Sequence, residues 1–283
     1  MAQDLAIFED LQANFLRTSH YPNDQRLLDM CDERGIYVWE ESHARQTPFK
    51  VPNFDEQIRV NTQEMVEKHY NHPCILMWGC LNECDTASDD GEAVHARVLQ
   101  QLRSLDDSRP ITYAGHLRQK DRCCGYADIV SLNLYTGWYG GEPEKTLEDF
   151  AQLLDWLDSE ASRGGEGKPV IISEFGAGAI PGVRNHRADP WSEEFQCVVI
   201  DEALKVYLTH PRIVGAAIWQ FCDVRVTREG NPHTYNAFSP MGRPRCMNNK
   251  GIVDEYRRPK LAYDTVRRHF AAAGAAARET GED

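Results

Sequence analysis

The chain has 283 residues, of which 41% are hydrophobic and 27% charged, an ordinary composition for a globular protein with a well-buried core. Its formal net charge of −13 argues against a surface that binds nucleic acid or an anionic membrane. Nine irregularly spaced cysteines indicate free thiols, and we find neither a secretion leader nor an apolar run of about 18 residues. We therefore expect a cytoplasmic protein without nucleic-acid or membrane partners.

In chain order, segments with helical periodicity alternate with short apolar runs. Helices are predicted at 4–12, 25–34, 54–69, 92–105, 147–161, 192–208 and 259–273. Strands are predicted at 13–19, 36–39, 74–83, 111–115, 129–135, 169–176 and 213–221. Asn23 is expected to cap the helix at 25–34 and Gly35 to end it, while 223–250 reads as a long polar loop.

This alternation favours parallel βαβ units in an α/β fold. Polar residues at the carboxyl ends of the strands are typical of a (β/α)₈ TIM barrel, and no glycine-rich nucleotide loop follows the first strand, as a doubly wound sheet would require. The chain opens on a helix, so the missing eighth strand is most simply the first. We expect one late-starting barrel domain at 1–276, lacking its first strand, and a disordered tail at 277–283.

Two of the predicted strands end in a glutamate. The run 74–81 leads into Asn82-Glu83, and the run 169–173 leads into Glu174. Strands buried on both faces read as continuous apolar runs, so a carboxylate at the end of each lies where the sheet opens onto a cleft. Two carboxyl groups about 5–5.5 Å apart are what retaining glycoside hydrolysis requires. The alternative is that both are structural carboxylates at strand ends.

Other candidate residues have structural explanations of similar weight. Trp219 lies in an apolar run, so a core position and a pocket wall are equally good interpretations. His20, at a strand end, either lines the pocket or is a satisfied structural histidine. Glu40-Glu41 with His43 has only weak spacing for a divalent cation, and a structural pair is favoured. We expect no metal and no cofactor.

Several motifs together point to a family. They are Arg17-Thr18-Ser19-His20-Tyr21-Pro22, Asn71-His72-Pro73 before Asn82-Glu83, the segment 168–176, the segments 133–139, 191–197 and 218–221, and Asn248-Asn249-Lys250-Gly251. In their order along the chain they resemble the catalytic barrel of family 2 glycoside hydrolases, the family of β-glucuronidases and β-galactosidases. The likeness is closest to β-glucuronidases and extends from Phe15 to about Val266.

The resemblance implies roles for individual residues. Glu83 would be the acid/base and Glu174 the nucleophile. Asn82 would bind the sugar 2-hydroxyl, and Tyr135 would orient Glu174.

The same resemblance implies a sugar pocket lined by His20, Tyr139 and Trp219. Asn248 and Lys250 match the Asn-x-Lys pair that contacts the sugar carboxylate in the β-glucuronidase group. Without that match, a solvated basic loop would be the better interpretation of this segment.

The predicted function is therefore retaining exo-hydrolysis of terminal β-D-glucuronides by two glutamates. A β-galactosidase or β-galacturonidase remains open, because the configuration at the 4-hydroxyl cannot be read from the sequence. So does an inactive truncated remnant, because the first strand and the domains that usually precede the barrel in this family are missing. The expected partner is a β-glycoside, most simply a uronide. A homo-oligomer, or a partner segment that completes the barrel, is also open.

Overall fold

Parallel strands alternate with helices along the chain. The computed structural model describes residues 1–226 and 242–280, and within them seven strands form one sheet in the order β1-β2-β3-β4-β5-β6-β7. The strands are β1 (Phe15–Arg17), β2 (Tyr37–Glu41), β3 (Ile75–Cys80), β4 (Ile111–Gly115), β5 (Val130–Asn133), β6 (Val170–Phe175) and β7 (Ile213–Ile218). The helices are α1 (Ala2–Asp10), α2 (Gln25–Arg34), α3 (Phe54–His69), α4 (Asp89–Leu105), α5 (Thr146–Leu157), α6 (Glu193–Tyr207) and α7 (Ala262–Thr280).

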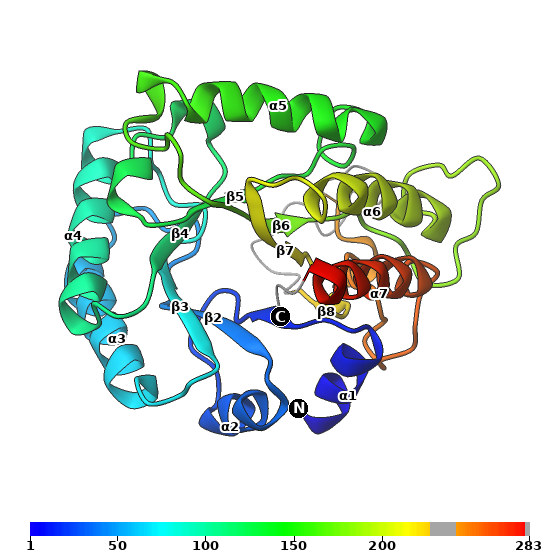
Figure 1. Cartoon of the computed structure of the whole chain (residues 1–283), viewed down its shortest axis with the longest axis horizontal. Helices are drawn as coiled ribbons and strands as arrows, with labels where there is room; N and C mark the ends of the chain where they lie inside the picture. Colours follow the sequence, from blue (N-terminus) through cyan, green and yellow to red (C-terminus); the bar gives the residue numbers. More distant parts are fainter. Residues whose placement is uncertain (227–241, 281–283) are drawn as a thin grey trace.

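The strands curve around a common centre and the helices lie outside them (Figure 1). Every neighbouring pair is parallel and consecutive in the chain, as in the wall of a TIM barrel. The described residues therefore form a TIM barrel that lacks one strand, and the predicted fold class is confirmed. The two edge strands, β1 and β7, are not paired with each other among the described residues.

Local sequence signals set the helix ends, and one predicted helix cap is wrong. Asp24, not Asn23, caps α2, because its side chain accepts a hydrogen bond from the Arg26 backbone N–H. Gly35 ends α2 as predicted, in a left-handed conformation with φ of +67° that glycine adopts without strain. Ser192 caps α6 by accepting a hydrogen bond from the Phe195 N–H.

The hydrophobic core lies mainly between the sheet and the helices. A smaller cluster fills the inside of the barrel, formed by Trp39, Met77, Ala114, Ile129 and Ile171. Strand β6 is buried along its whole length, whereas no residue of β7 is fully buried. This difference follows from topology, because β6 has a strand on each side and β7 has one on one side only.

The end of the chain forms a hairpin and a long helix. Strands β8 (Val224–Arg225) and β9 (Met247–Asn248) pair antiparallel and flank 227–241, the part of the predicted polar loop that lies outside the described residues. Helix α7 extends past residue 277, where the tail was expected, and 281–283 also lie outside the described residues. None of the helices in the described parts of the chain is long and apolar enough to cross a bilayer.

Candidate active site

The carboxyl ends of four parallel strands bring the candidate site residues together, some of them predicted and others not. Arg17 ends β1, Asn82 and Glu83 follow β3, Asn133 ends β5, and Glu174 lies near the end of β6. Because the strands are parallel, their carboxyl ends meet at one edge of the sheet.

Arg17 connects three strands from a buried position. Its side chain is only 2% exposed. Nη1 donates to Glu174 Oε1 at 2.9 Å, and Nη2 donates to Asn82 Oδ1 at 2.8 Å and to Glu41 Oε1 at 3.0 Å. Burial lowers the pKa of Arg17, but Glu41 and Glu174 outweigh it and hold the pKa above its ordinary value. The guanidinium therefore stays charged and fixes the positions of a carboxylate and an amide in the site.

Glu174 is held by a donor on each carboxylate oxygen. Arg17 occupies Oε1, and the Tyr135 hydroxyl donates to Oε2 at 2.7 Å. Burial, followed by the charge of Glu174, raises the pKa of Tyr135 well above its usual value, so the phenol remains a donor. The predicted contact between Tyr135 and Glu174 is present in the structure.

Glu83 also has a donor on each oxygen, but both donors are neutral amides. Asn133 Nδ2 donates to Oε1 at 3.0 Å, and Gln46 Nε2 donates to Oε2 at 2.7 Å. The backbone φ is +54° at Leu81 and +50° at Glu83, a left-handed conformation that residues other than glycine rarely adopt. Strained backbone of this kind is concentrated at functional sites.

A chain of hydrogen bonds joins the two glutamates. It runs from Glu174 to Arg17, then to Asn82 Oδ1, which also accepts a bond of 3.3 Å from Asn133 Nδ2, and on to Glu83. Asn82 Nδ2 is buried and has no protein partner among the described residues. That amide N–H₂ therefore has hydrogen-bonding capacity left for a ligand.

Lys250 lies inside the protein next to aromatic rings. It is 2% exposed, and its Nζ lies 5.1 Å from the ring centres of both Trp138 and Tyr139. Burial lowers the pKa of Lys250 to about 7, with Arg243 acting in the same direction and Glu174 and Glu83 opposing it. Tyr139 packs against Tyr135, and Tyr135 bonds to Glu174, so the amine lies near the carboxylate site.

A buried ion pair supports the segment that carries Lys250. Lys260 Nζ donates to Asp223 Oδ1 and to the Ala179 carbonyl, both at 2.8 Å, and to the Asn249 carbonyl at 3.0 Å. Asp223 Oδ1 also accepts from the Gly251 N–H at 2.8 Å. These bonds fix the backbone on both sides of Lys250.

The other predicted binding residues lie around the same region. His20 stacks on Trp219 with ring centres 5.0 Å apart. Tyr139 packs edge-on against Tyr135 at 5.0 Å, and Asn248 Oδ1 accepts a bond of 3.4 Å from the Lys250 N–H. The Asn248 side chain is thus held by the backbone of its own segment.

Four residues that contact the site were not among the predicted site residues: Arg17, Glu41, Gln46 and Asn133. Asn133 stands at the end of a predicted strand, a position that could have revealed it. Glu41 was expected to be a structural carboxylate beside Glu40. Each has its own partner, since Glu40 bonds to His69 Nδ1 at 2.9 Å and Glu41 to Arg17.

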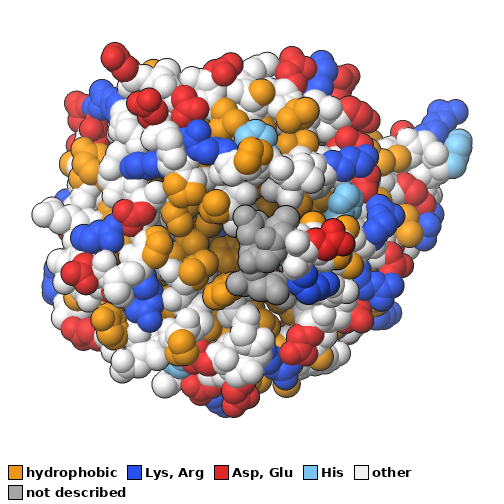
Figure 2. Space-filling view, viewed as in Figure 1, with side chains coloured by type: hydrophobic (Ala, Val, Ile, Leu, Met, Phe, Trp, Pro, Cys, Tyr) orange, Lys and Arg blue, Asp and Glu red, His pale blue; other side chains and the backbone are white. Residues whose placement is uncertain are grey.

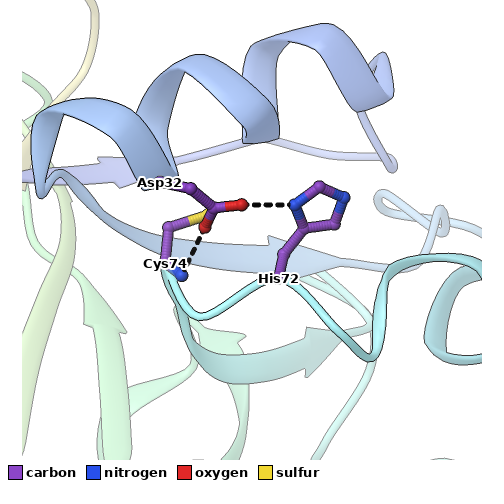
Figure 3. Close-up of side chains that lie close together, drawn as sticks. All are labelled: Asp32, His72 and Cys74. Atoms are coloured by element: carbon purple, nitrogen blue, oxygen red, sulfur yellow. Dashed lines mark hydrogen bonds and ion pairs between the residues drawn. The ribbon is translucent and has the colours of Figure 1, made fainter.

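A separate group of potential ligand atoms lies on the outside of the sheet, where Asp32 of α2 meets His72 and Cys74 (Figure 3). Asp32 Oδ2 bonds to His72 Nδ1 at 2.6 Å, and Oδ1 accepts from the Cys74 N–H at 2.7 Å. Burial raises the pKa of the Cys74 thiol far above its usual value, which is unfavourable for a thiolate ligand. The group acts as a hydrogen-bonded brace between α2 and the start of β3.

Comparison with known proteins agrees with this geometry. Residues 1–273 match the family model "Glycosyl hydrolases family 2, TIM barrel domain". The chain is similar to the β-glucuronidase of Mus musculus, with 29% identity over 95% of this chain and 40% of the mouse protein. The β-glucuronidase of Streptococcus agalactiae serotype V is 28% identical over 78% of this chain and 40% of that protein.

Solved structures give the same picture. A β-galacturonidase of Eisenbergiella tayi bound to galacturonate superimposes with a TM-score of 0.88 and 42% identity, over 96% of this chain and 47% of that one. A β-glucuronidase of Bifidobacterium dentium in complex with coumarin-3-O-glucuronide superimposes with a TM-score of 0.83 and 27% identity, over 95% and 42%. The chain thus spans less than half the length of these relatives.

Proposed function

Because this chain belongs to glycosyl hydrolase family 2, we propose that its barrel hydrolyses terminal β-linked uronides by a retaining mechanism with two glutamates. The observation that carries the proposal is the arrangement of the site. Glu83 and Glu174 are connected through Arg17, Asn82 and Asn133. The buried amine of Lys250 lies against the ring of Tyr139, which packs on Tyr135, the hydroxyl partner of Glu174.

In the proposed first step, the Glu174 carboxylate attacks the anomeric carbon while Glu83 donates its proton to the glycosidic oxygen. The aglycone leaves as an alcohol and a covalent glycosyl-enzyme remains. In the second step, Glu83 takes a proton from water, the water oxygen attacks the anomeric carbon, and Glu174 is released as a carboxylate. Arg17 and Tyr135 keep Glu174 oriented throughout.

Asn82 and Lys250 would supply selectivity. The unpartnered Nδ2 of Asn82 is suited to bond the sugar 2-hydroxyl, a contact that strengthens in an oxocarbenium-like transition state. The Lys250 ammonium would bond the carboxylate at C6, which distinguishes a uronide from its parent hexose. Tyr139 and Trp219 would provide apolar ring surface, and Asn248 and His20 polar contacts at the rim.

Among uronides, we propose galacturonides ahead of glucuronides. The sequence motifs alone favoured glucuronides. The galacturonate-bound Eisenbergiella tayi protein shares 42% identity with this chain, whereas the named β-glucuronidases share 26–29%. A difference of this size favours the substrate of the more similar protein.

A panel of nitrophenyl β-glycosides tests the proposal, comparing galacturonide, glucuronide, galactoside and glucoside at equal concentration. We expect turnover of a uronide, with retention at the anomeric carbon observed by proton NMR. The Glu174→Gln variant, which replaces the nucleophile by an amide of equal shape, is the matched control. Hydrolysis with inversion would contradict the mechanism, and preference for a neutral galactoside would contradict the substrate.

The remnant alternative predicts a different result, namely a folded chain that turns over none of the four glycosides.

The location of the protein in the cell and the completion of its barrel belong to the same proposal. We propose a cytoplasmic location, which the nine free cysteines support, and a polypeptide segment from outside residues 1–283 that completes the barrel.

A further inference from the structure

Two consecutive residues of β6, Ser173 and Glu174, both bond to residues of the site, although neighbours on a strand normally face opposite sides. The register of β5 and β6 explains this. Leu132 pairs with Ile172, but the next residue, Asn133, pairs with Glu174. Ser173 is thus the extra residue of a β-bulge, an irregularity that redirects side chains beside active sites. Its side chain is buried, and Oγ donates to Asn133 Oδ1 at 2.7 Å.

Arg17 fixes the direction of the hydrogen bonds in this group. A guanidinium can only donate, so the end of the Asn82 amide that lies 2.8 Å from Arg17 Nη2 is its oxygen. That oxygen also accepts from the nearer end of the Asn133 amide, at 3.3 Å, which must therefore be Nδ2. The far end of the Asn133 amide is then the oxygen, and the Ser173 hydroxyl has to donate to it. Ser173 therefore holds one end of an amide whose other end is oriented by Arg17 through Asn82.

This orientation decides how Glu83 carries a proton. Asn133 Nδ2 also donates to Glu83 Oε1 at 3.0 Å. A protonated carboxyl group has one O–H, and its other oxygen accepts. Because Oε1 faces a fixed donor, the acid proton of Glu83 belongs on Oε2. Gln46 Nε2 donates to Oε2 at 2.7 Å, but Gln46 is an exposed loop residue, so its side chain can turn away and leave Oε2 to a substrate.

We propose that Ser173 is a positioning residue for the acid/base: it holds the Asn133 amide so that Oε1 of Glu83 stays an acceptor and Oε2 carries the transferable proton. The inference rests on the proposed function, which gives Glu83 the acid role. In the first step, the bond from the anomeric carbon to the glycosidic oxygen breaks, and that oxygen keeps both electrons and takes the proton from Oε2. In the second step, Oε2 takes a proton from the attacking water. Oε1 accepts from Asn133 throughout.

The two residues that hold Glu83 Oε1 are buried and neutral. Ser173 is 1% exposed and Asn133 4%. The charged side chains of the protein are instead spread around its outside (Figure 2). Salt screens charges at the surface but acts little on buried groups. The effect of Ser173 should therefore be the same at low and at high salt, and an effect that disappears at high salt would contradict the proposal.

A pair of uronides of the same sugar, one with a phenyl and one with a dinitrophenyl aglycone, tests the role in acid catalysis. Phenolate needs a proton from the acid in order to leave, whereas dinitrophenolate leaves without one. Ser173→Ala leaves Asn133 Oδ1 buried without its donor and lets the amide rotate. The value of kcat/KM, which reports the first step, should fall about tenfold on the phenyl uronide and change little on the dinitrophenyl uronide.

Two further variants are the controls. Ser173→Thr keeps the hydroxyl and should behave as the parent protein does. Ser131→Ala removes another buried hydroxyl of the same sheet, which bonds to Thr112 Oγ1 at 2.7 Å outside the site, and both rates should stay unchanged. Equal losses on the two substrates in Ser173→Ala would show a purely structural role. A loss as large in Ser173→Thr as in Ser173→Ala would show that packing, and not the hydroxyl, is what matters.

Neutron diffraction locates the proton without relying on turnover. In a deuterium-exchanged crystal of the 283-residue protein, grown at a pH low enough to protonate Glu83, we expect a deuteron on Oε2 and the Ser173 deuteron directed at Asn133 Oδ1. A deuteron on Oε1, or an Asn133 amide with its oxygen toward Glu83, would overturn the proposal. A chain with the expected deuterons that hydrolyses no glycoside would refute the proposed function and the acid role with it, while the position of the proton would stand.

Discussion

Replacing Lys250 by methionine separates the selectivity of the site from its stability. Methionine keeps most of the length of the side chain, suits the aromatic surroundings of Trp138 and Tyr139, and removes only the charge. A charge-assisted hydrogen bond contributes about 1.5–3 kcal/mol. On a uronide, kcat/KM should therefore fall roughly 10- to 150-fold, while any activity on the neutral hexoside should be unchanged.

The same substitution should stabilise the protein. Burial lowers the pKa of Lys250 from 10.5 to about 7, so the folded protein disfavours the ammonium that the unfolded chain carries below pH 10.5. The unfolded chain thus binds more protons between pH 7 and 10.5, and this lysine destabilises the fold most at and below pH 7. Lys250→Met should raise the melting temperature, with a gain of a few kcal/mol at pH 6 that shrinks toward pH 10.

Both effects can be measured on one preparation. Steady-state rates on paired galacturonide and galactoside substrates give the selectivity, and calorimetric melting at pH 6 and pH 9 gives the stability. Because a neutral amine cannot pair with the substrate carboxylate, kcat/KM of the parent protein on the uronide should also decline above pH 7. Equal losses on both substrates, or a variant less stable at pH 6 than the parent protein, would refute the reasoning.

Three further predictions follow from the described contacts. Glu174→Ala should lose turnover and regain it with azide, which attacks the anomeric carbon in place of the carboxylate; undiminished turnover would show that another residue is the nucleophile. Arg17→Lys keeps the charge but cannot reach Glu41, Asn82 and Glu174 together, so kcat should fall at least about tenfold with little change in KM, and a change in KM alone would contradict this role. Lys260→Met should lower the free energy of unfolding in urea by about 3–5 kcal/mol, because Asp223 would lose its ion-pair partner. The double variant with Asp223→Asn should recover part of this loss. Equal losses in the single and double variants would argue against the ion pair.

The fold was predictable because it depends on local signals. Apolar runs bounded by polar residues marked all seven strands of the sheet, but not the short strands β8 and β9 in the predicted polar loop. The periodicity of the intervening segments marked the helices within a few residues, except that α7 continues to Thr280 instead of ending at 273. The one cap that was misplaced, Asn23 for Asp24, illustrates a limit of such signals. Both side chains can cap a helix, and only the backbone conformation decides which one faces the free N–H groups.

Part of the candidate site could be named from the sequence, but its connections could not. Both glutamates, Asn82 and Tyr135 could be named from strand ends and motifs. The roles of the neighbours Glu40 and Glu41 could not, because adjacent residues of a strand face opposite sides and the sequence does not state which side is the interior. The contact of Gln46 with Glu83 depends on the path of a loop, for which no periodicity exists.

Arg17 also has a consequence for how activity is acquired during folding. Its partners Glu41, Asn82 and Glu174 are 24, 65 and 157 positions away along the chain. Contacts of such high sequence separation form slowly, because the entropy of closing long loops opposes them until most of the chain is in place. After dilution from urea, helical circular dichroism should therefore recover before hydrolysis does. The time at which hydrolysis recovers would report when the last contacts of Arg17 form.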